Sequence, residues 1–160
     1  MHRTKIDLPE QARAEASALL NARLADAIDL MMQAKQAHWN VKGPAFFGLH
    51  ALFDKVHEEV AGYVDLVAER AVQLGHVAEG TVRTSAERSR LGEYPLRIAS
   101  GRDHADALAA ALSRFGELSR QAIDQAGELR DAGTADIFTE ISRGTDQLLW
   151  MVEAHLHAEA

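Results

Sequence analysis

A chain of 160 residues with 47% hydrophobic and 26% charged residues has the composition of a globular protein and is long enough for one domain with a buried core. The absence of cysteine excludes disulfides, thiolate nucleophiles and iron–sulfur clusters, and the formal net charge of −7 disfavours general nucleic-acid binding. Because the sequence shows neither an apolar secretory signal nor a run of roughly 18 apolar residues, we expect a cytoplasmic protein.

The first half of the chain predicts two long helices. Pro9 stands where a first helical turn would begin, and apolar residues then recur at i, i+3 and i+4 spacing to about Val41. The break at Lys42-Gly43-Pro44 separates this helix from a second one over residues 46–74, for which Gly75 is the expected stop.

The second half predicts a short helix and two further long ones. Thr84-Ser85-Ala86-Glu87 fits a capping box, and Ser100 is the expected cap of a helix over 102–130. Gly133 should end that helix and Thr134 should cap a last one that runs to about Leu156. No run has a β period, so the predicted fold class is all-α, a ferritin-like four-helix bundle with the short helix in its long middle crossover. We expect a single domain over residues 1–160, with residues 1–8 as a short flexible N-terminal tail.

Four side chains with metal-binding chemistry lie on one stripe of the second predicted helix. His50 and Asp54 are four residues apart, and so are Asp65 and Glu69. The 11 residues from Asp54 to Asp65 make three turns plus roughly 20°, which keeps both pairs on the same face. The two pairs are nevertheless roughly 16 Å apart along the helix, so they cannot hold one metal ion together.

Two copies of this helix, packed antiparallel across a two-fold axis, bring the two pairs together. In such a pair the position numbers of facing residues have a constant sum, and this sum is 119 both for His50 with Glu69 and for Asp54 with Asp65. The axis then passes between Glu59 and Val60, beside the small residues Ala61 and Gly62. The sequence therefore predicts two equivalent sites per dimer, each shared between the chains.

His38 is expected to complete each site. The turn between the first two helices centres near Pro44, six residues after His38 and six before His50, so the two imidazoles should lie opposite each other. Two imidazoles and three carboxylates suit iron, and also manganese or zinc. A single His/Asp pair at this spacing is more often a solvated salt bridge, but two pairs in one register together with His38 favour a metal site.

The segment His38-Trp39-Asn40-Val41-Lys42-Gly43, the residues His50, Asp54 and Asp65, and the run from Ala68 to Gly75 resemble the Dps family of mini-ferritins. Thr134 to Phe138 and Leu149-Trp150-Met151 resemble the last helix of that family. The resemblance covers nearly the whole chain, and the H-x11-H-x3-D-x10-D-x3-E spacing is specific.

This resemblance implies a hollow dodecamer with a ferroxidase centre at the dimer two-fold axis. His38, His50 and Asp54 correspond to the ligands of one subunit, and Asp65 and Glu69 to those of its partner, with iron as Fe2+ and Fe3+ and up to two ions per site. The implied reaction is oxidation of Fe(II), preferably by hydrogen peroxide, followed by storage of ferric mineral and chemical protection of DNA from oxidative damage. No Glu-x-x-His motif occurs, so we do not expect an internal di-iron site.

Two alternatives remain open at this point. A nucleoid-associated DNA-binding protein with incidental iron binding is disfavoured, because the segment before Pro9 is only weakly basic and twelve subunits at −7 each would sum to −84. The five arginines between 83 and 102 form either a local basic patch or, more often in proteins, a solvated or interface surface. A structural helical oligomer that holds zinc is the weaker alternative.

Several further residues are candidates for accessory roles. Glu58 is a candidate iron ligand, although a contact outside the ligand set is the more common role for it and for His57. Trp39 would either intercept oxidising equivalents or pack against the partner subunit. Asp131 and Asp136 either cap the last helix or line an iron-entry pore, as the resemblance implies. The sequence also predicts three aromatic core residues: Phe115, Phe138 and Trp150.

Overall fold

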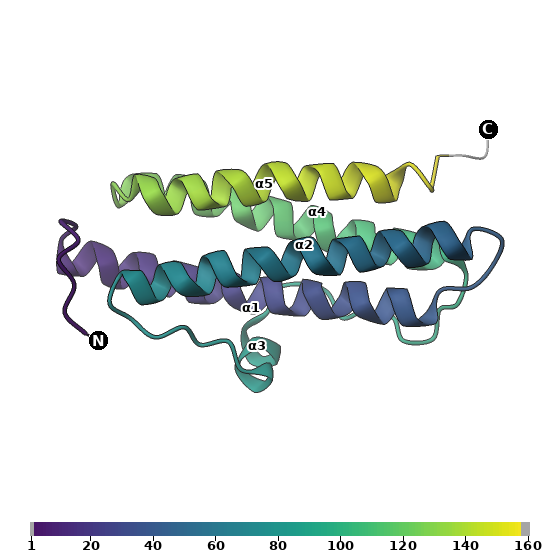
Figure 1. Ribbon diagram of the computed structural model, residues 1–160, viewed down its shortest axis with the longest axis horizontal. Coiled ribbons are helices and arrows are strands. Elements are labelled where there is room, and N and C mark those ends of the chain that lie inside the picture. The colour runs from purple at the N-terminus through teal and green to yellow at the C-terminus, as the bar shows by residue number, and fades with distance from the viewer. Residues whose placement is uncertain (1, 158–160) are drawn as a thin grey trace.

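The computed structural model describes residues 2–157, which form four long helices and one short one (Figure 1). Their bounds are α1 Glu10–Asn40, α2 Phe46–Gln73, α3 Val82–Arg88, α4 Gly101–Glu128 and α5 Ala132–Glu153. The main packing partners are α1 with α2 and α4 with α5, and α3 lies against α1 in the long crossover. The predicted all-α, ferritin-like architecture is confirmed. No helix within residues 2–157 combines the length and apolar character that a bilayer span requires.

The core follows from the apolar spacing of each helix. On α2 the buried side chains recur every three or four residues, and they include Leu49, Phe53, Val56, Val60 and Val67. Their face is opposite the stripe that carries the ligand candidates. The stripe is therefore available for contacts outside the subunit.

The predicted aromatic core is right for two residues and wrong for the third. Phe115 and Phe138 are fully buried, but Trp150 is 65% exposed. The buried stripe of α5 includes Leu148 and Val152. Trp150 lies two residues from each of them, which turns it about 200° away, onto the outer face.

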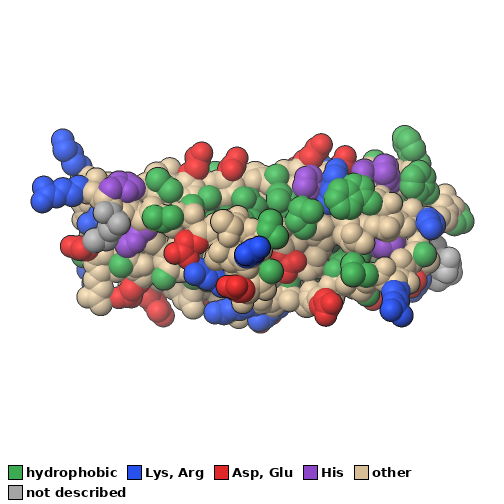
Figure 2. Space-filling model, turned by 90° about the horizontal axis from the view of Figure 1, so that it is seen from below, with side chains coloured by type: hydrophobic (Ala, Val, Ile, Leu, Met, Phe, Trp, Pro, Cys, Tyr) green, Lys and Arg blue, Asp and Glu red, His purple; other side chains and the backbone are tan. Residues whose placement is uncertain are grey.

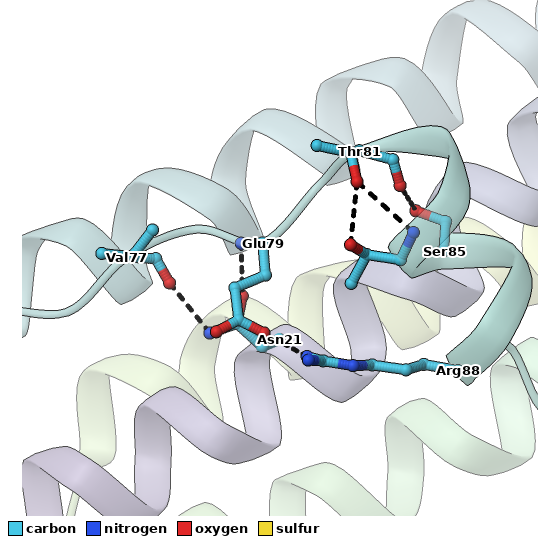
Figure 3. A network of polar contacts seen from close by, with 7 residues as sticks. Asn21, Val77, Glu79, Thr81, Ser85 and Arg88 are labelled. Carbon is cyan, nitrogen blue, oxygen red and sulfur yellow. Dashed lines mark hydrogen bonds and ion pairs between the residues drawn. The ribbon is translucent and has the colours of Figure 1, made fainter.

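The caps of α3 and α5 differ from the prediction. Helix α3 begins one turn before the predicted capping box, because the Thr81 side chain accepts the hydrogen bond of the Thr84 amide. Asn21 of α1 fixes the preceding loop by donating to the Val77 carbonyl and accepting from the Glu79 amide (Figure 3). With the loop held in this way, the backbone at Thr81 is extended, as a helix cap requires, and α3 begins at the next residue.

Helix α5 is capped by Asp131 rather than Thr134. The Asp131 carboxylate accepts from the Thr134 amide at 3.1 Å and also from the Thr134 hydroxyl. Gly133 lies inside the first turn of α5, where a Cβ atom would come within 3.0 Å of the Arg70 guanidinium. This glycine thus permits a close approach instead of ending a helix. The predicted Ser100 cap of α4 is confirmed, since its side chain accepts from the Asp103 amide.

The residues predicted as an N-terminal tail lie against the end of α2. The His2 amide donates to the carbonyl of Gly75 at 2.9 Å, and Ile6 and Leu8 pack against the core. Gly75, the expected stop of the second helix, has φ +92°, and a side chain there would meet the His2 carbonyl at 2.7 Å. Both the helix end and the path of residues 2–8 depend on this glycine.

Candidate metal centre

The α1–α2 turn places His38 and His50 face to face, as the sequence predicts. Their rings are stacked with centroids 3.7 Å apart. The Nδ1 atom of His38 lies 2.7 Å from the carbonyl oxygen of His50, and Nδ1 of His50 lies 2.9 Å from the carbonyl oxygen of His38. This reciprocal bonding connects the end of α1 with the start of α2.

The reciprocal bonds fix the tautomer of both rings. A carbonyl oxygen only accepts hydrogen bonds, so each Nδ1 must carry the proton and donate it. In the neutral ring, each Nε2 then keeps its lone pair, and this is the form that binds a metal ion. Within a single chain, both imidazoles are therefore held in the orientation and tautomer that a metal ligand requires.

Asp54 lies beside the His38 ring and is paired with a residue that the sequence analysis missed. Its Oδ1 is 4.0 Å from Nδ1 of His38 and accepts a short hydrogen bond from the Lys35 ammonium. The bond from Lys35 is the main cause that lowers the pKa of the Asp54 carboxyl, so this group stays ionised. The available signal was spacing, since Lys35 lies three residues before His38 and shares its helix face.

Asp65 and Glu69 lie further along the same stripe of α2 and are both exposed. The ion pairs among residues 2–157 include neither carboxylate. Within this part of the chain, no three His, Asp or Glu side chains come close enough together to hold a metal ion. One subunit thus contains both halves of the predicted ligand set, but one half lies at the α1–α2 turn and the other further along α2.

The end of α2 that carries the two carboxylates is anchored by a buried ion pair. Arg70 donates to Asp131 at 2.7 Å and to the Thr134 hydroxyl at 3.1 Å. Asp131 is only 2% exposed. Of the two roles considered for Asp131, capping is the one that the geometry shows, whereas Asp136 is exposed on α5.

The other candidates have less defined surroundings. His57 donates Nδ1–H to the Met31 carbonyl at 3.0 Å, and Glu58 and Trp39 are exposed. All five arginines between 83 and 102 are exposed. One of them, Arg88, pairs with Glu79 (Figure 3). Toward the end with the α1–α2 turn, histidine and hydrophobic side chains lie together on the surface (Figure 2).

Comparison with known proteins agrees with this fold. The family model of the ferritin-like domain matches residues 17–159. A DNA protection during starvation protein from Agrobacterium fabrum is 43% identical over 99% of this chain and 98% of its own length. The family model thus places the chain among ferritin-like proteins, and the full-length similarity to a DNA protection during starvation protein identifies the family within that class. The chain belongs to the Dps family.

Solved structures support the same assignment. DpsC from Streptomyces coelicolor superposes with a TM-score of 0.93 at 30% identity, covering 99% of this chain and 92% of its own. A Dps protein from Vibrio cholerae, described as a member of a broad superfamily of ferritin-like diiron-carboxylate proteins, gives 0.89 at 26% identity and covers 98% of both chains. The Dps resemblance inferred from the sequence motifs is confirmed.

Proposed function

We propose that two copies of this chain pair their α2 helices antiparallel and oxidise Fe(II) at two shared sites. Each site takes His38, His50 and Asp54 from one subunit and Asp65 and Glu69 from the other. The observation that carries this proposal is the reciprocal bonding of His38 and His50 through their Nδ1 atoms, which leaves both Nε2 atoms available, with Asp54 4.0 Å from the His38 ring. Such bonding orients imidazoles that bind metal ions in proteins.

The donor set suits iron as a substrate. Carboxylate oxygens and neutral imidazoles bind ferrous ions, and three carboxylates offset the charge that builds up as two ions reach the ferric state. Hydrogen peroxide is the preferred oxidant in this proposal. Each peroxide accepts one electron from each of two ferrous ions and its O–O bond breaks, giving two hydroxide ions or, with protons, two waters. The paired electron transfer avoids a free hydroxyl radical.

The ferric product would be stored as mineral inside a hollow dodecamer, and DNA would be protected by removal of Fe(II) and peroxide. Asp136 remains the candidate for an iron-entry pore, and Glu58 and Trp39 remain candidates for accessory roles. Direct DNA binding is the alternative function. The net charge of −7 argues against it, and a salt-resistant gel shift at neutral pH would favour it.

The double variant His38→Ala/Asp65→Ala tests the site. It removes one ligand from each half, so ferrous oxidation by peroxide should slow by about a hundredfold while the oligomer persists. The rate is followed by ferric absorbance after anaerobic Fe(II) loading, and assembly by size-exclusion chromatography. A matched control is His155→Ala/Asp124→Ala, two exposed residues away from the stripe. Oxidation at the wild-type rate in the first variant would refute the site, and absence of ferric absorbance in the wild type would favour a structural metal.

A further inference from the structure

The outward stripe of α2 continues beyond the ligand candidates at both ends with apolar residues. Phe47 lies three residues before His50, and Val72 three residues after Glu69, so both share the face of the ligands. Phe47 is 83% exposed and Val72 is 43% exposed. Large apolar side chains exposed at this level on a ligand-bearing face indicate a surface that another protein covers.

A shallow hollow surrounds Val72. It has a volume of about 350 Å³ and is lined by Ala68, Glu69, Val72, Gln73 and Ala78. Apart from the Glu69 carboxylate and the Gln73 amide, these side chains are small or apolar. The hollow thus suits an apolar side chain from outside the subunit, next to a ligand of the shared site.

We propose that Phe47 of each subunit inserts into this hollow of the other subunit, beside Val72 of the partner subunit. The inference rests on the antiparallel α2 pairing of the proposed function, and it adds a contact that the ligands do not require. Position numbers 47 and 72 have the same sum of 119 as the two ligand pairs. The register that assembles the metal ligands therefore also brings each exposed phenylalanine to the opposite hollow.

The occupant is a second copy of the chain rather than an unrelated partner. Phe47 and the hollow around Val72 both lie on α2, and they are equally far along the helix from the proposed two-fold axis. Two-fold symmetry then forms the contact twice, once at each end of the paired helices. Within one chain the contact is impossible, since 25 residues of helix separate Phe47 from Val72 by roughly 37 Å. The core cannot supply it either, because the buried face of α2 is the opposite one.

This contact closes the outer end of each shared site. The hollow has Glu69 as one wall, so a phenyl ring there excludes water from the side of the carboxylate that faces away from the axis. It also holds the ends of the two helices together at the position where the ligand pairs must meet. Phe47 is thus a residue of the interface and not a ligand.

Engineered cysteines test the contact cleanly, because the natural chain contains none. The double variant Phe47→Cys/Val72→Cys, treated with a short bifunctional maleimide, should give covalent dimers on denaturing gels. Phe47→Cys alone should remain monomeric there, since position 47 faces position 72 and not itself. Phe47→Cys/Leu96→Cys is the matched control, because Leu96 is 71% exposed but lies outside α2.

A reference variant near the axis separates this inference from the proposed function. Ala61 lies beside the proposed axis, so the single variant Ala61→Cys should cross-link to its copy in the partner subunit whenever the α2 helices pair antiparallel in this register. Cross-linking of the reference variant without the 47/72 pair would overturn the inference and leave the paired helices intact. Failure of both would overturn both.

A binding measurement gives independent evidence. Phe47→Ser should raise the concentration at which dimers dissociate by about tenfold or more, as for apolar residues seated in interface pockets. Leu96→Ser should leave it unchanged. An equal effect of the two substitutions would contradict the assigned contact.

Discussion

The two halves of the candidate site differ in how far one subunit prepares them. At the α1–α2 turn, His38 and His50 are stacked, hydrogen-bonded and half-buried. At the other end of α2, Asp65 and Glu69 are exposed and outside the ion pairs of the described residues. Imidazoles tolerate close packing because they are neutral, whereas carboxylates held together without a cation repel each other. In the proposed shared site, the carboxylate half therefore needs the partner subunit and a metal ion, so oxidation should require assembly.

The largest expected effect comes from mixing two inactive variants. His38→Ala/His50→Ala lacks the imidazole half and Asp65→Ala/Glu69→Ala lacks the carboxylate half, so each alone should oxidise Fe(II) about a hundredfold more slowly. A hybrid dimer has one site with both halves intact. After random re-pairing, about one quarter of all sites should be active.

The rate of ferric absorbance measures this recovery, and native mass spectrometry verifies that hybrids form. Hybrids that stay as slow as the separate variants would show that each site lies within one subunit. The proposal that the two halves of one site come from different subunits would then be wrong.

A smaller effect concerns the anchor of the carboxylate half. Asp131→Ala leaves Arg70 half-buried without its partner and removes the α5 cap, so the free energy of unfolding should fall by about 3 kcal/mol. Urea denaturation at fixed protein concentration measures the loss. Asp131→Asn keeps a capping acceptor and should recover about 1 kcal/mol of it. Asp136→Ala, on the exposed face of α5, is the neutral reference, and an equal loss there would contradict the role of the ion pair.

A buried histidine of α4 should make the stability of the bundle depend on pH. His104 is buried and its Nδ1 lies 2.6 Å from the hydroxyl of Tyr94, near the end of α1. Burial lowers the pKa of His104 below 6.5, against the opposing effect of Asp103. Below about pH 6.5 the unfolded chain therefore binds a proton that the folded chain does not, and the free energy of unfolding decreases until the folded-state pKa is reached.

Urea denaturation at pH 7.5 and 5.5 tests this dependence against the variant His104→Gln. The variant should lose less stability between the two pH values than the wild type does. Equal losses would exclude His104 as a contributor to the acid sensitivity.

The smallest effect concerns Lys35. Its ammonium competes with a metal ion for Asp54, and an ion pair near the surface adds little stability. Lys35→Met should therefore tighten cobalt(II) binding by about threefold, measured by calorimetry without oxidation. Lys55→Met removes a lysine of α2 that pairs with Glu59 at 3.7 Å, and should leave the affinity unchanged. Weaker binding in Lys35→Met would show that the lysine supports the site.

The sequence alone determined the helices and the family, and it predicts the candidate ligand stripe, because these depend on local spacing. Apolar periodicity gives the four long helices, and the distances among His50, Asp54, Asp65 and Glu69 give one face and one pairing register. The turn at Lys42-Gly43-Pro44 was sufficient to predict that His38 and His50 would meet. All of these features need only residues close together on one helix or across one short turn.

Only the tertiary structure decided the caps, the exposure of Trp150 and the partners of charged residues. Thr81 and Asp131 are caps because Asn21 fixes one loop and Arg70 anchors the other, and both contacts span more than 50 residues of sequence. The ammonium of Lys35 reaches Asp54 because α1 and α2 pack side by side. Which of several acceptors a side chain chooses depends on three-dimensional distance, and local sequence pattern does not encode that distance.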